Sequence, residues 1–286
     1  MGGSILMKQQ NGLNNQNRML TIIVFNNDSD SEFSHMIEHE GVEYIVVNGQ
    51  DRCSAYNSVL EKVNDEYVWF VDNSISITKK ELERIVDRLS VSETDYFAFD
   101  YIVCYGDGSH DVWHSNLYYS RPSQIVTMYS REKHVLFLPS MIFRMSIIRN
   151  NSLSFCDSAG MYAQKLFVIE YLHMVEKVDC VKDVVASFCF NVDKEYYCRK
   201  PEYTKQRLEQ YKVFFDRLKC ILEPQDVSFL EDDCFLFKDE CSIYGVLPRL
   251  RFNSMIPLPY AAIKRNAWSY KSLLKLTVVY VLNKII

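Results

Sequence analysis

Residues 67–77, YVWFVDNSISI, carry the clearest structural signal in this chain. The stretch opens with apolar residues rich in β-branched and aromatic side chains and turns polar at Asp72, as a buried strand does where it ends. Thr78 and Glu81 follow at the spacing of a capping box, which predicts a helix over residues 78–89. The strand therefore brings one carboxylate to its C-terminal end, the edge of an open α/β sheet where ligands bind. A carboxylate there can hold a divalent cation, which in turn can neutralise a diphosphate.

The segments before this strand show the same alternation of strand and helix. Apolar runs at residues 20–25 and 44–47 predict two more strands. A helical stretch opens at Ser54, and the polar residues 64–66 end it just before the strand at residue 67. This order of elements indicates an α/β fold.

These segments resemble the family 2 glycosyltransferases of the GT-A type. The family pattern is roughly A-R-N on a helix, then G-E-Y-I-x-F-L-D-x-D-D. Here residues 55–57 read A-Y-N and residues 65–74 read D-E-Y-V-W-F-V-D-N-S. Residues 20–27, L-T-I-I-V-F-N-N, look like the family's first strand, and residues 43–49, E-Y-I-V-V-N-G, look like its E-I-I-V-V-D-D-G strand.

The resemblance implies a Rossmann-type mixed sheet flanked by helices, with a helical C-terminal extension. It also implies a hexosyltransferase-type enzyme that moves a sugar from a nucleotide-diphosphate sugar to a glycan or lipid-linked acceptor, as in surface polysaccharide synthesis. The expected cofactor is a divalent metal, magnesium or manganese.

Several positions depart from the family pattern. The D-x-D metal motif ends in Ser74 instead of a second carboxylate, the uridine-contacting Asp is replaced by Asn48, and the Arg of A-R-N is replaced by Tyr56. The Glu-Asp pair that carries the catalytic base would lie near residues 162–164, which read Y-A-Q. These departures leave an alternative open: a catalytically degenerate GT-A-like domain that binds a glycan or a partner enzyme.

The candidate site residues follow from the same comparison. Asp72 and Ser74 are the expected metal ligands, since magnesium needs only one or two carboxylates beside the phosphate oxygens. Asp157 is the nearest carboxylate to the missing Glu-Asp pair and is the expected base. The expected nucleotide contacts are Asn27, Asn48, Arg52, Asn57 and Asp72. Each also has a plain interpretation, as a capping, turn or surface residue.

The middle of the chain predicts a hairpin and two helices. A strand is expected over residues 95–105, a turn over 106–109 and a partner strand over 112–119. Asp100 is a lone acid in that strand, so it is either paired or faces the cleft. His110 and His114 are surface residues by default, although a histidine near a cleft could act as a base or metal ligand. Helices are expected over residues 158–176 and from Pro201 to Pro224.

Composition and charge divide the chain into four expected parts. Residues 1–18 read as a disordered leader, 19–195 as the nucleotide-sugar domain, 196–245 as a helical extension and 246–286 as a basic amphipathic tail. The tail suits an anionic membrane surface, or it packs as a helix with its lysines in solvent.

The same composition limits the partners and the compartment. Because the net charge is −5 despite the basic tail, nucleic acid is a poor partner. No apolar run is long enough to span a membrane. Nine cysteines without a C-x-x-C motif favour reduced thiols. The expected location is therefore cytoplasmic, at the inner face of the membrane if the tail binds there.

Overall fold

The computed structural model describes six parts of the chain. They are residues 5–6, 19–26, 37–49, 51–114, 137–189 and 205–221. The predicted leader, apart from its residues 5–6, and the predicted basic tail lie outside the described residues.

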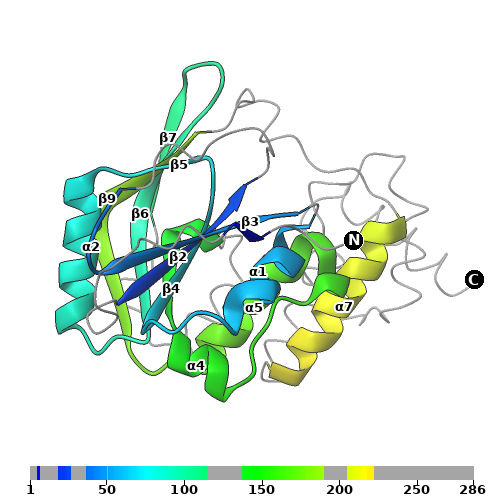
Figure 1. Ribbon diagram of the computed structural model, residues 1–286. Helices are drawn as coiled ribbons and strands as arrows, with labels where there is room; N and C mark the ends of the chain where they lie inside the picture. The colour runs from blue at the N-terminus through cyan, green and yellow to red at the C-terminus, as the bar shows by residue number, and fades with distance from the viewer. Residues whose placement is uncertain are drawn as a thin grey trace, which may run out of the picture.

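A mixed sheet forms the centre of the described structure (Figure 1), which confirms the expected GT-A-like α/β fold. Its strand order is β1-β3-β2-β4-β8-β6-β9-β5, and β7 pairs with β6 outside that path. The strands are β1 (Ile5–Leu6), β2 (Leu20–Asn26), β3 (Val42–Asn48), β4 (Tyr67–Asp72), β5 (Ile75–Ser76), β6 (Tyr96–Cys104), β7 (His110–Trp113), β8 (Met141–Arg144) and β9 (Val178–Cys189). Strands β3, β2 and β4 run parallel to one another, and β8 runs antiparallel to β4.

Strand β4 lies deep in this sheet, and all six of its residues are buried. Its side chains alternate between the two faces because successive residues of a strand point in opposite directions. Val68 and Phe70 pack into the core on one face, and Trp69 and Val71 pack into the core on the other. Burial on both faces explains why the sequence shows one continuous apolar run here.

Helices cover both faces of the sheet (Figure 1). Among the helices of the described residues, α2 covers one face alone, and the side chains of the other four pack in the core on the opposite face. The helices are α1 (Arg52–Leu60), α2 (Lys79–Val91), α4 (Met145–Asn150), α5 (Ala163–His173) and α7 (Lys205–Ile221), with short 3-10 segments η2 (Leu138–Ser140) and η3 (Asp157–Tyr162). The capping box predicted for α2 is present: Thr78 and Glu81 bond each other's backbone N–H groups.

Helix α5 is shorter than the helix predicted over residues 158–176. The chain forms the 3-10 segment η3 first, and Gly160 within it has a φ of +51° that interrupts the helical path. A Cβ at Gly160 would lie 2.1 Å from the side chain of Gln210 on α7. Gly160 therefore permits both the kink and the close approach of α7.

Two strands differ from the sequence-based prediction. Strand β7 begins at His110, two residues earlier than predicted, because a tight turn around Gly108 (φ +81°) starts the return at once. Residues 115–119 of the predicted strand lie outside the described residues. Strand β9 was not predicted at all. It shifts register against β6 near Phe99 and Asp100, so its apolar residues do not alternate regularly.

Helix α7 lies in the predicted helical extension, yet it shares the core of the sheet domain. Phe214 and Leu218 are buried in the same cluster as α5 and β4. Arg217 also pairs with the buried Glu170 of α5 at 2.6 Å. The boundary predicted at residue 195 stays a prediction. No helix in the described ranges is long and apolar enough to cross a bilayer.

Candidate functional site

Three polar residues end the parallel strands β3, β2 and β4 at one edge of the sheet. Asn48 of β3 lies beside Asn26 of β2, and Asp72 of β4 lies beside Phe25 of β2. The side chain of Asn73 donates a 3.4 Å hydrogen bond to that of Asn26. The structure thus places Asp72 at the C-terminal end of a buried strand, as the sequence predicted, and its part in a functional site stays a prediction.

Helix α1 starts at this edge, earlier than predicted. Asp51 is its N-cap and accepts a 2.6 Å hydrogen bond from the backbone N–H of Ser54. Asp51, a residue type that is preferred at helix N-caps, is the sequence signal for this start, and the prediction overlooked it. The helix consequently begins with Arg52 and places it in the first turn, close to Asp72.

Arg52 and Asp72 form an ion pair in which Nη2 lies 2.9 Å from Oδ2. The Asp72 side chain is only 7% exposed, whereas that of Arg52 is 29% exposed. The guanidinium carbon also lies 5.3 Å from the centre of the Phe25 ring. An arginine that is paired and stacked in this way is held in one orientation at the surface of the site.

The second oxygen of Asp72 is occupied by Ser74. Oδ1 accepts a 3.0 Å hydrogen bond from the Ser74 backbone N–H and another from the Ser74 hydroxyl. This is a local turn closed by a carboxylate, which is common after a strand. Asp72 therefore has donors at both oxygens.

Asp157, the predicted base, is brought to the same helix. The Ser54 hydroxyl donates to its Oδ2 at 3.0 Å, and the Asn57 amide lies 3.5 Å from its Oδ1. Asp157 is exposed, in contrast to the buried Asp72. Because Arg52 holds Asp72 and Ser54 holds Asp157, the first turn of α1 links the two carboxylates.

Asn57 clamps α1 to the segment before η3. Its amide nitrogen donates to the Phe155 carbonyl at 2.8 Å, and its amide oxygen accepts from the Phe155 N–H at 2.8 Å. Both ends of the side chain are thus engaged within the protein. Its predicted contact with a nucleotide stays a prediction, and the positioning of Asp157 is the role that the contacts support.

We expect Asn57→Ala to lower the free energy of unfolding by about 2 kcal/mol, because it leaves the N–H and carbonyl of the buried Phe155 without a partner. Urea denaturation followed by circular dichroism measures the change. Asn151→Ala is the matched control, since the amide of Asn151 makes only an exposed bond within its own helix end. Equal losses for the two variants would contradict the clamp.

Asn48 and Asn27 differ in what the structure shows. The Oδ1 atom of Asn48 is buried and has no hydrogen-bond partner among the described residues. A buried acceptor without a partner is costly, so a ligand donor would stabilise it. Asn27 lies outside the described residues.

Tyr56 takes the place of the arginine in the family's A-R-N pattern. It is fully buried, and its hydroxyl donates to the carbonyl of Val71 at 2.8 Å. Burial raises the pKa of this phenol well above its usual value. Tyr56 therefore hydrogen-bonds the backbone near the end of β4, and Arg52 supplies a positive charge one helical turn earlier.

Asp100 and His114 form a pair that the sequence left open. Asp100 is buried on β6, and its Oδ2 lies 2.6 Å from Nδ1 of His114, just beyond the end of β7. Of the two outcomes predicted for Asp100, the structure shows the paired one.

The two residues predicted to bind a divalent metal, Asp72 and Ser74, are already engaged in contacts within the protein. Arg52 covers one oxygen of Asp72 and Ser74 donates to the other. The described residues also contain no group of three or more histidine, cysteine or acidic side chains that could hold a metal. Metal binding by Asp72 and Ser74 stays a prediction, and it would require Asp72 to release Arg52.

The fold and this edge define an α/β protein whose polar site lies at the carboxyl ends of parallel strands. The model of the family described as "Glycosyl transferase family 2" matches residues 10–152. That match spans half of the chain, and the chain belongs to this family. It is therefore a glycosyltransferase, as the resemblance implied. No curated protein matches the chain in sequence.

Solved structures of similar fold include S. aureus TarS. The crystal structure of TarS 1–349 in complex with UDP-GlcNAc has a TM-score of 0.62 and 12% identity, over 93% of this chain and 88% of that one. The same fragment in complex with UDP has a TM-score of 0.59, also at 12% identity and over the same shares of the two chains. Another crystal structure of S. aureus TarS has a TM-score of 0.61 at 12% identity, over 93% of this chain and 55% of that one. At this level of identity the similarity establishes the fold.

Proposed function

We propose that this chain transfers a sugar from a nucleotide-diphosphate sugar to a glycan or lipid-linked acceptor. The observation that carries the proposal is the first turn of α1, which joins Asp72 at the end of β4 to Arg52 and ties Ser54 to Asp157. This places a cation and two carboxylates at the edge where α/β sheets bind nucleotides. TarS, a protein of similar fold, was crystallised with UDP and with UDP-GlcNAc.

Each residue has a proposed role in this reaction. Arg52 faces the diphosphate of the donor. Negative charge develops on this diphosphate as it leaves the sugar, and the guanidinium stabilises that charge. The buried Oδ1 of Asn48 accepts a hydrogen bond from an N–H or O–H group of the base or ribose. Asp157 accepts the proton of the attacking hydroxyl, since it is exposed and held by Ser54. Metal coordination by Asp72 and Ser74 remains part of the prediction from the resemblance.

The first test is binding of UDP-, GDP-, dTDP- and CMP-sugars, measured as a shift of the thermal midpoint with and without magnesium or manganese. We expect one donor to stabilise the protein. If no donor shifts the unfolding midpoint of a well-folded sample, the proposal is wrong.

The second candidate function is a degenerate domain that binds a glycan or a partner enzyme. It is favoured by Ser74 in place of a second carboxylate and by the engagement of Asp72 with Arg52. Turnover of the sugar donor distinguishes an active transferase from a degenerate binding domain. Release of UDP or another nucleotide diphosphate that stops with Asp157→Asn supports the transferase, and binding without any release supports the degenerate domain.

A further inference from the structure

The contacts of Asp72 differ from those that a metal ligand needs. A ligand carboxylate turns a lone pair towards the metal, whereas here Arg52 contacts one oxygen of Asp72 and Ser74 donates to the other. The Ser74 hydroxyl, the other predicted ligand, donates to Asp72. A divalent ion at this carboxylate would also lie next to the Arg52 guanidinium, and the two positive charges would repel each other.

Arg52 has the features of a binding cation. It uses Nη2 for Asp72, while a guanidinium carries five N–H donors in a planar fork. Phe25 stacks against the group and Asp72 anchors it, so little side-chain freedom remains to be lost when an anion binds. Its side chain stays 29% exposed, which leaves donors open to a ligand.

The surrounding backbone adds to this charge. Arg52 is the first residue of α1, and the N-terminus of a helix carries a partial positive charge and N–H groups that favour anions. Arg52 also precedes Tyr56 by one helical turn, and Tyr56 replaces the arginine of the family pattern. The site therefore keeps an arginine on this helix while losing the second metal-binding carboxylate.

We propose that Arg52, in place of a divalent metal, provides the positive charge that binds the diphosphate of the donor, so that donor binding does not require metal. Asp72 then positions Arg52 and does not ligate a cation. This inference rests on the proposed function, because it assumes that a nucleotide diphosphate binds at this edge.

The test is isothermal titration calorimetry with UDP, GDP and dTDP, each in excess EDTA and in excess magnesium. We expect one nucleotide to bind with a dissociation constant that agrees within about twofold in the two buffers, well under the tenfold change that corresponds to about 1.4 kcal/mol. Arg52→Gln should weaken binding in EDTA at least about tenfold. The affinity of Arg52→Lys should lie between those of the parent and Arg52→Gln, because lysine keeps the charge but lacks the planar guanidinium fork.

Two further variants separate this role from a structural one. Arg84→Gln is the matched control, because Arg84 on α2 is an exposed arginine that pairs with Asp183 at 2.5 Å, and its binding should equal that of the parent. Asp72→Asn keeps a side-chain oxygen that can accept from Arg52 and removes a negative charge beside the diphosphate, so binding in EDTA should stay within about threefold of the parent. Thermal unfolding of every variant checks that it folds.

The outcomes are distinct. Binding that appears only with magnesium, or that Asp72→Asn abolishes together with the response to magnesium, would overturn this inference and leave the proposed function in place. An Arg52→Gln variant that folds and binds as tightly as the parent would overturn it as well. A parent protein that binds none of the nucleotides in either buffer would overturn both.

Discussion

Replacing Trp69 by alanine should lower the free energy of unfolding by about 4 kcal/mol, the usual range for removing a buried aromatic side chain from a core. Trp69 of β4 is fully buried and meets Phe99 of β6 edge to face, with the ring centres 5.5 Å apart. Its indole N–H donates to the carbonyl of Pro139 at 2.7 Å. The change therefore opens a cavity and leaves a buried carbonyl without its donor. Urea denaturation with fluorescence or circular dichroism measures the loss.

Trp69→Phe separates the two contributions. Phenylalanine keeps most of the buried apolar surface but cannot donate to Pro139, so the expected loss is about 1–3 kcal/mol. Pro139 belongs to η2, which precedes β8, and Trp69 therefore holds η2 against the sheet. A Trp69→Ala variant as stable as the parent would show that this part of the core is packed differently.

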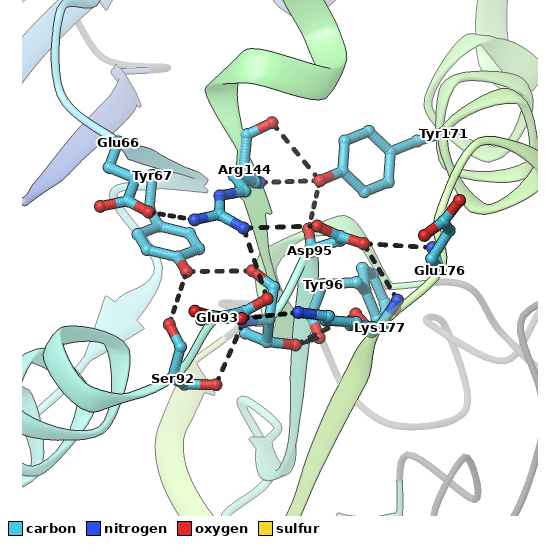
Figure 2. Close-up of polar contacts among 11 residues, drawn as sticks. Glu66, Tyr67, Ser92, Glu93, Asp95, Tyr96, Arg144, Tyr171, Glu176 and Lys177 are labelled. Carbon is cyan, nitrogen blue, oxygen red and sulfur yellow. Dashed lines mark hydrogen bonds and ion pairs between the residues drawn. The ribbon is translucent and has the colours of Figure 1, made fainter.

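Replacing Asp95 by alanine should cost about 3 kcal/mol, because Asp95 is the centre of a network of polar contacts (Figure 2) and charged acceptors make strong hydrogen bonds. Its Oδ2 accepts the backbone N–H groups of Glu176 and Lys177 at 3.1 and 2.9 Å, and its Oδ1 lies 3.5 Å from Arg144. The carboxylate thus ties the start of β6 to the start of β9 and the end of β8. Chemical denaturation compares the variant with the parent.

Lys177→Ala is the control within the same network. The Lys177 ammonium pairs with Glu93 at 2.7 Å, but both side chains are exposed, and such pairs add little to stability. Its unfolding midpoint should stay close to that of the parent. If Lys177→Ala proved as damaging as Asp95→Ala, the network would owe its strength to surface charge and not to the backbone bonds of Asp95.

The Asp95 network also has buried phenols, and it lies away from the candidate site. Burial raises the pKa of Tyr67 to about 12, and it raises the pKa of Tyr171 well above the usual value. Both stay neutral in the folded protein around neutral pH, which suits their hydrogen bonds to backbone carbonyls. Arg144 ends β8 and Asp95 directly precedes β6, both near the start of β4, whereas Asp72 ends β4.

Much of the fold could be predicted from local patterns. The run ending at Asp72 and the Thr78–Glu81 box predicted β4 and α2 with nearly correct bounds, because burial on both faces and a helix cap leave signals within a few residues. Strand β9 could not be predicted in this way. Its register shift against β6 removes the alternation that marks a strand, and only its pairing with β6 defines it.

Some of the candidate site residues lie together in the structure, although their roles stay predictions. Asp72, Ser74, Arg52, Asn57 and Asp157 lie around the N-terminal half of α1, whereas Asn48 has no hydrogen-bond partner among the described residues and Asn27 lies outside them. Their partners were not evident, since Asn57 binds the backbone of Phe155 and Ser54 holds Asp157 about a hundred residues away. Contacts at such separation depend on how α1 packs against the segment before η3.

Local patterns were sufficient to show that a buried strand ends in a carboxylate and is followed by a capped helix, because hydrophobic periodicity and capping are properties of neighbouring residues. Only the tertiary structure decided what that carboxylate does there. The parallel register of β2 and β4 brings Phe25 beside Asp72, and the Asp51 cap starts α1 at Arg52, so an arginine twenty positions earlier pairs with Asp72. The charge that faces the site therefore follows from the packing of α1 against the sheet, which no local pattern in the sequence records.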